Sequence, residues 1–83
     1  MVAGVDAMTL GQLVRTYRRA AGLTLEDVAA RTGVGSEMIA RLERGQTKRP
    51  RTEAVMGICA VIGLPLQDAL AAMQVHDDGD GAL

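Results

Sequence analysis

Residues 22–45 read GLTLEDVAARTGVGSEMIARLERG, and the fold depends on this stretch. Apolar residues recur in it every three or four positions, which is the spacing of an α-helix and not the alternation of a strand. Gly33 interrupts this spacing near the middle of the stretch. The pattern therefore predicts two short helices, over about 25–31 and 36–44, joined by a tight turn.

Several residues of this stretch have a steric or polar reason for their place. Thr24, with Asp27 three positions later, resembles a capping box at the start of the first helix, with Asp in place of Glu or Gln. Ala29 supplies the small side chain that two helices need where they cross near a right angle, and Gly33 supplies the turn. Ile39 faces inward and fixes the second helix to the core. Together these residues predict a helix-turn-helix.

The same helical spacing continues on both sides of residues 22–45. It predicts further helices over about 9–21, 53–62 and 66–73, with Thr52 as a cap before the second of them. No segment alternates as a strand does. The sequence therefore predicts an all-α domain of five short helices.

The chain has 83 residues, which is enough for one small domain. We expect residues 1–8 to form an N-terminal extension and residues 9–74 to form the folded domain. Residues 75–83 contain three Asp and two Gly without a helical apolar pattern, so we expect a disordered acidic tail. Nine basic residues against seven acidic ones give residues 1–74 a charge of +2, while the tail carries −3.

The composition excludes several classes of protein. Cys59 is the one cysteine, so no internal disulfide forms, and we expect it to be buried as a small hydrophobic residue. His76 has no partner for a metal or for catalysis. The apolar runs are far shorter than the roughly 20 residues that span a bilayer. The sequence thus predicts a soluble, cytoplasmic protein that is no enzyme and needs no cofactor or metal.

The outward face of the helix over 36–44 is polar and mostly basic. With Ile39 and Leu42 inward, this face presents the following residues: Glu37, Ala40, Arg41 and Arg44. Arg donates two hydrogen bonds to guanine, Glu accepts one from cytosine, and Ala lets a helix approach a thymine methyl. Between Gly33 and Arg51 the basic residues exceed the acidic ones by three. The face is suited to contact with DNA bases.

A purely structural interpretation of the same residues stays open. Glu37 and Arg41 stand at i and i+4, so they can also form a surface ion pair, although the helix-turn-helix favours groove contact. The sequence QTKRPR at 46–51 can be a solvated turn, but three cations around a proline favour contact with phosphates. Met38 lies one turn before Leu42, and we expect it in the core.

Taken together, these elements resemble the lambdoid repressor and Cro family, known in bacteria as the XRE family, over about Leu10 to Leu70. The motifs that carry the resemblance are GLTLEDVAARTGV at 22–34, IARLERG at 39–45, TKRPR at 47–51 and IGLPLQDAL at 62–70. The resemblance implies a lambda-repressor-like domain whose third helix enters the major groove, while the next loop holds phosphates.

The resemblance also implies roles for individual residues. Base contacts would come from Ser36, Glu37, Ala40 and Arg41. Phosphate contacts would come from Arg44, Thr47, Lys48, Arg49 and Arg51. One such helix reads too few base pairs to find a site in a genome, so a homodimer is expected. Its contact zone would comprise Gly63, Leu64, Pro65, Leu66, Leu70 and Met73.

The implied function is a sequence-specific regulator of transcription that binds double-stranded DNA, most simply a repressor on a two-fold operator. The sequence shows two departures from the family pattern, and the first of them supports an alternative, as does the acidic pI of about 5.7. Leu25 stands where the family has a Gln that contacts the DNA backbone, and Glu26 and Asp27 beside it repel phosphates. Gly35 replaces the usual Ser cap, which leaves Ser36 as the alternative cap. The alternative is a protein-interaction module of the antitoxin or adaptor type, with weak or no DNA binding.

Overall fold

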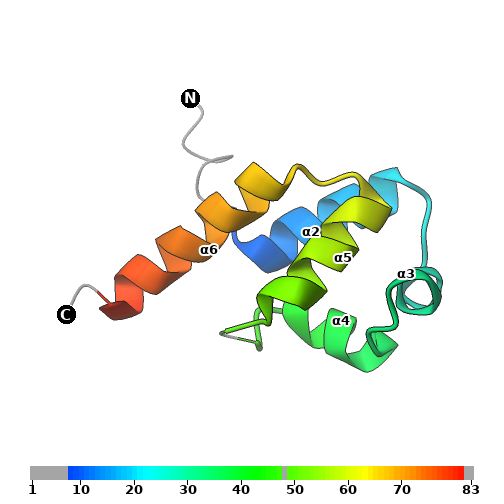
Figure 1. Ribbon diagram of the computed structural model, residues 1–83, viewed down its shortest axis with the longest axis horizontal. Coiled ribbons are helices and arrows are strands. Elements are labelled where there is room, and N and C mark those ends of the chain that lie inside the picture. The colour runs from blue at the N-terminus through cyan, green and yellow to red at the C-terminus, as the bar shows by residue number, and fades with distance from the viewer. Residues whose placement is uncertain (1–7, 48, 82–83) are drawn as a thin grey trace.

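The computed structural model describes the backbone of residues 8–47 and 49–81, and the side chains of residues 8–47 and 49–73. Within these ranges the chain is entirely helical, without a strand, and the prediction of an all-α domain is confirmed. The helices are α2 (Leu10–Ala20), α3 (Leu25–Thr32), α4 (Ser36–Glu43), α5 (Thr52–Ile62) and α6 (Leu66–Gly81) (Figure 1).

The capping box predicted at the start of α3 is present. The Thr24 hydroxyl accepts a hydrogen bond from the backbone N–H of Asp27 at 3.0 Å, and the Asp27 carboxylate accepts one from the N–H of Thr24 at 2.9 Å. Gly33 ends α3 with φ 80° and ψ 1°, a left-handed conformation that favours glycine. The turn between α3 and α4 therefore follows from the sequence.

The caps predicted for the next two helices are wrong. Ser36 and Thr52 are the first residues of α4 and α5, and the N-cap residues are Gly35 and Arg51. An N-cap has extended backbone dihedrals, and these fall one residue earlier than expected, at Gly35 (φ −62°, ψ 142°) and Arg51 (φ −67°, ψ 135°). Neither helix has a side-chain hydrogen bond at its N-cap.

The core lies where α2, α3, α4 and α5 meet, and its centre consists of aliphatic side chains. The largest fully buried ones are Val14, Val28, Ile39, Val55 and Ile58. Cys59 is also buried, as predicted, and burial raises the pKa of its thiol. Both α2 and α3 pack on α4, and both also pack on α5. The core therefore fixes α4 against two other helices, α2 and α3.

Gly11 allows α2 to approach the end of α4 closely. A Cβ atom at this position would clash with the carbonyl oxygen of Leu42 and would lie 2.8 Å from that of Glu43. Only a residue without a side chain fits such a contact without a shift of the backbone. Gly11 thus sets the distance between the first helix and the last turn of α4.

The backbone of α6 remains helical to Gly81, whereas the sequence pattern predicted an irregular tail from residue 75. The prediction used apolar spacing, which indicates packing, but a helix once begun gains one hydrogen bond per added residue. In Figure 1 the C-terminal half of α6 runs outward from the other helices. The division into an extension, a domain and a tail stays a prediction, and residues 1–7 lie outside the described part.

Candidate nucleic-acid interface

The exposed face of α4 carries the predicted polar residues. Glu37, Arg41 and Arg44 recur at i, i+4 and i+7 and are all exposed, while Ile39 and Leu42 are buried. Two further predicted base contacts, Ser36 and Ala40, are half-buried at the margin of this face. The face is therefore a stripe of charged side chains on a helix that the core holds from behind.

Glu37 and Arg41 form an ion pair with 3.7 Å between the carboxylate and the guanidinium. Both side chains are more than half exposed, so the pair is worth at most about 1 kcal/mol. The structural interpretation of these two residues is thus correct in the free protein. Because the pair is weak, it leaves both groups able to exchange one partner for another.

The loop after α4 carries more basic residues. Arg44 ends α4 and donates a hydrogen bond to the side-chain oxygen of Gln46 at 3.2 Å. Arg49 and Arg51 are exposed, and Arg51 precedes the first turn of α5. Thr47 is half-buried. Lys48, the remaining predicted phosphate contact, lies outside the described residues.

Sequence reasoning missed an ion pair that fixes the end of α4. Arg18 of α2 donates to both carboxylate oxygens of Glu43, at 2.6 and 3.0 Å, and to the carbonyl of Leu23 at 2.8 Å. The two side chains are 13% and 7% exposed, and the hydrogen bond to Glu43 raises the pKa of Arg18. Glu43 thus adds no unpaired negative charge beside the basic face. No local sequence pattern predicts this pair, because its two residues lie 25 positions apart in the chain.

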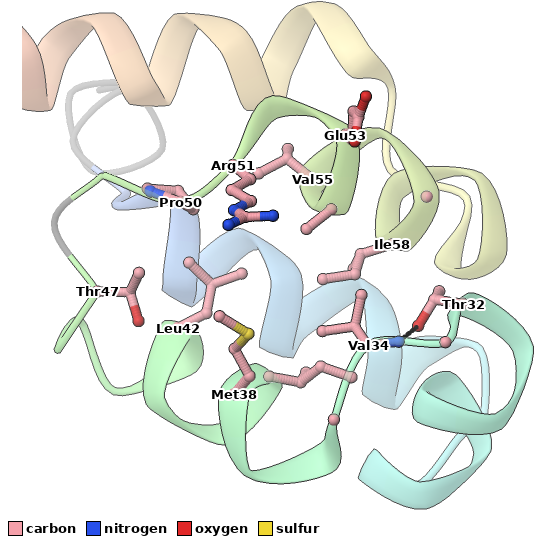
Figure 2. Close-up of a pocket in the computed structure, with 15 residues that line it drawn as sticks. Thr32, Val34, Met38, Leu42, Thr47, Pro50, Arg51, Glu53, Val55 and Ile58 are labelled. Carbon is pink, nitrogen blue, oxygen red and sulfur yellow. Dashed lines mark hydrogen bonds between the residues drawn. The ribbon is translucent and has the colours of Figure 1, made fainter.

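An open groove of about 430 Å³ lies between α4, the turn before it and α5 (Figure 2). Met38 and Leu42 of α4 line it, with Pro50 and Arg51 across from them. Met38 is 52% exposed, so the prediction that it belongs to the core is wrong. Met38 lies one turn before Leu42, at the rim of the groove. Its side chain is exposed because the open groove lies beside it.

The predicted dimer contact zone is divided between surface and core. Leu64 is 3% exposed and belongs to the core of the single chain, so it offers little surface to a second copy. Leu64 follows the left-handed Gly63, and its backbone N–H donates a hydrogen bond to the carbonyl of Cys59 at 3.1 Å. Leu66 and Leu70 of α6 are exposed, as are Gly63 and Pro65, while Met73 packs partly on the core.

The first turn of α3 is acidic, as the sequence indicates. Leu25 is half-buried against the core, and Glu26 and Asp27 are exposed. Hydrogen bonds with the backbone and side chain of Thr24 lower the pKa of Asp27. This carboxylate is therefore charged at neutral pH, and the turn offers phosphates no attraction.

No helix among the described residues is long and apolar enough to cross a membrane. The family model for a helix-turn-helix domain matches residues 9–73. The chain is 32% identical over 62 residues to the uncharacterised HTH-type transcriptional regulator RghRB of Bacillus subtilis strain 168. That alignment covers 75% of this chain and 45% of the relative, so the chain spans less than half of the relative's length.

No solved structure matches the chain significantly. The family match nonetheless covers the helices α2 to α5 and the start of α6, including both helices of the predicted helix-turn-helix. The relative's alignment also covers three quarters of the chain. The chain therefore belongs to the helix-turn-helix family of the XRE type.

Proposed function

We propose that this protein is a sequence-specific, double-stranded DNA-binding regulator that represses transcription by occupying an operator. The observation that carries the proposal is the exposed charged stripe of Glu37, Arg41 and Arg44 on a helix fixed by the core behind it. A rigid helix with polar residues at i, i+4 and i+7 suits the major groove of DNA. The relative named as a transcriptional regulator supports the same function.

In this proposal α4 lies in the major groove and reads base edges. Arg41, in the middle of the helix, donates two hydrogen bonds to one guanine once it leaves Glu37. Glu37 then accepts a hydrogen bond from a cytosine, and Ser36 and Ala40 border the same bases. The weak pairing of Glu37 with Arg41 makes this exchange inexpensive, since an exposed pair contributes little in water.

The loop after α4 then holds the DNA backbone. The residues proposed to contact phosphates are Arg44, Thr47, Lys48, Arg49 and Arg51. Contacts of this kind set the register of the helix on the duplex and carry no sequence information themselves. Proline at position 50 limits the backbone freedom of the loop.

A homodimer is the form proposed to occupy the operator. The exposed Leu66 and Leu70 of α6, together with Gly63, Pro65 and Met73, form the proposed contact between the two copies. A two-fold protein requires two half-sites about 10 base pairs apart from centre to centre.

A second candidate is a protein-interaction module that keeps the fold without binding DNA. The observation that favours it is the acidic first turn of α3, where Glu26 and the charged Asp27 stand next to the half-buried Leu25. In this case the basic loop would have no phosphate partner.

A binding assay with duplex DNA separates the two candidates. Fluorescence polarisation with genomic fragments, at low and at moderate salt, is expected to show tight binding of a few fragments and weak binding of the rest. The affinity for all fragments is expected to fall as salt rises, because bound phosphates release counterions. A protein that binds no fragment even at low salt would be the interaction module.

A further inference from the structure

Two arginines of α2 have no role in the proposed interface. Arg15 and Arg19 are exposed one turn apart, and α2 contains no acidic residue. Among the described residues the ion pairs are Arg18 with Glu43 and Glu37 with Arg41. Arg15 and Arg19 thus take part in no ion pair within the described part of the chain.

Helical spacing puts Arg15 on the same stripe of α2 as two residues that meet the last turn of α4. Gly11, Arg15 and Arg18 recur at i, i+4 and i+7 and therefore share one stripe of the helix. Both ends of this stripe touch Glu43, because a Cβ on Gly11 would lie 2.8 Å from its carbonyl oxygen and Arg18 binds its carboxylate. Arg15 lies between these two contacts, and Arg19 follows it by one turn.

The ion pair leaves a positive surface at this corner of the molecule. Arg18 neutralises Glu43, and the next residue along the chain is the exposed Arg44. We call the exposed side chains of Arg15 and Arg19 the arginine flank. The flank borders the charged stripe of α4 on the side of Glu43.

The other side of α4 faces the basic loop. Met38 and Leu42 share a stripe that lines the groove with Thr47 and Arg51. At about 100° per residue, this stripe and Glu43 lie on different sides of α4, with the exposed stripe of Glu37 between them. Cations therefore stand on both sides of the helix proposed to read bases.

We propose that the arginine flank binds backbone phosphates of the DNA strand opposite to the strand held by the loop. This inference rests on the proposed function. The major groove is about 12 Å wide and has a phosphate backbone on each side, so a helix inside it lies between two rows of negative charge. The first turn of α3 has Leu25, Glu26 and Asp27 and attracts neither row. The flank supplies the charge that this turn does not.

The test compares the double variant Arg15→Gln/Arg19→Gln with the control variant Arg31→Gln. Arg31 is equally an exposed arginine, but it lies in the last turn of α3, near Asp27. Binding is measured by fluorescence polarisation over a salt series, with a duplex selected from a random pool by the wild-type protein and with a random duplex. Circular dichroism melts check that each variant is folded.

The double variant is expected to bind both duplexes more weakly and to reduce the log-log salt slope by about 1.8, or 0.9 for each lost contact. The preferred bases are expected to stay the same, and Arg31→Gln is expected to keep the wild-type slope. Arg15→Lys/Arg19→Lys retains the charge and is expected to restore the slope. These exposed side chains contribute little packing, so all three variants are expected to have the melting temperature of the wild-type protein.

Phosphate ethylation interference then assigns the contacts to a strand. Wild-type protein is expected to be sensitive on both strands of a half-site, and the double variant is expected to lose the sensitivity on one strand only. Arg49→Gln is expected to lose it on the other strand. An unchanged salt slope, or loss on the same strand as Arg49→Gln, would overturn the flank while leaving the proposed function intact. Failure of wild-type protein to bind any duplex would overturn the proposed function itself.

Discussion

At the scale of single residues, the absence of a side chain at Gly11 lets α2 lie close to the last turn of α4. The change Gly11→Ala is expected to lower the free energy of unfolding by about 1–3 kcal/mol or more, because its Cβ would meet backbone oxygens that cannot move aside. Gly57→Ala is the matched control. Its Cβ would meet the Thr32 Cγ2 methyl at 3.9 Å, an ordinary contact.

Gly57 lies inside α5, so alanine there is expected to stabilise the protein by about 0.5–1 kcal/mol through helix propensity. Urea unfolding followed by circular dichroism measures both changes. Equal effects of the two substitutions, or a stable Gly11→Ala variant, would contradict the close approach of α2 to α4.

The burial of some single residues could be predicted from the sequence, and that of others could not. The inward direction of Ile39 follows from spacing alone, because Glu37 and Arg41 occupy the opposite face of a regular helix. The spacing predicts that Met38 is buried, which is wrong, and it does not predict that Leu64 is buried within the single chain. Both residues lie close to an irregular segment of the chain. Whether such a side chain is buried depends on which residues pack opposite it, and apolar spacing does not specify these.

At the scale of elements, α2 and α4 are joined by the pair of Arg18 and Glu43. Glu43→Gln is expected to lower the free energy of unfolding by about 3 kcal/mol, because it leaves a nearly buried guanidinium without its counter-charge. Glu37→Gln also breaks an ion pair of α4, but an exposed one, and is expected to cost less than about 0.5 kcal/mol. Chemical denaturation measures the free energy of unfolding of both variants. Similar decreases would show that the burial of the pair of Arg18 and Glu43 adds nothing to stability.

Asp27, at the start of α3, is expected to make the stability of the protein depend on pH. Hydrogen bonds with Thr24 lower the pKa of Asp27 in the folded state, so its charged form favours folding at pH values above its unfolded pKa. This contribution is lost as pH falls through the lower, folded pKa. Thermal melts between about pH 5 and pH 2 are expected to show a smaller decrease for Asp27→Asn than for wild-type protein. Glu26→Gln removes a neighbouring charge without touching Thr24 and is expected to retain the wild-type decrease.

The order and approximate bounds of the helices could be predicted, as could the capping box of α3, because these depend on neighbours within four residues. The pair of Arg18 with Glu43 and the full extent of α6 could not. The first requires knowledge of which helices meet, and the second depends on backbone hydrogen bonding that the apolar pattern does not report.

At the scale of the whole molecule, the exposed leucines of α6 are proposed to join two copies on DNA. Leu70→Glu is expected to weaken operator binding and to leave the fold intact, because the side chain is 39% exposed in the single chain. Met56→Glu changes a similarly exposed apolar side chain of α5 and is expected to bind as wild type. Footprinting and stoichiometry at saturation report the result. Protection of one half-site by wild-type protein, at one chain per duplex, would argue against the homodimer.

The orientation of the molecule on DNA is the central claim, and it divides the residues that read bases from those that hold the backbone. Arg41→Ala is expected to cost about 1–3 kcal/mol on the operator and to relax the preference at one base position, with little effect on random DNA. Arg49→Ala is expected to weaken binding to operator and random DNA alike and to reduce the salt slope by about 0.9. Both side chains are exposed, so both variants are expected to remain folded.

The most direct test is selection of bound duplexes from a random pool by wild-type protein, Arg41→Ala and Arg49→Ala in parallel. Wild-type protein is predicted to select a two-fold sequence with half-sites about 10 base pairs apart. Arg49→Ala is predicted to select the same sequence, and Arg41→Ala is predicted to lose one base position in each half-site. The contradicting result is a changed base preference for Arg49→Ala together with an unchanged selected sequence for Arg41→Ala.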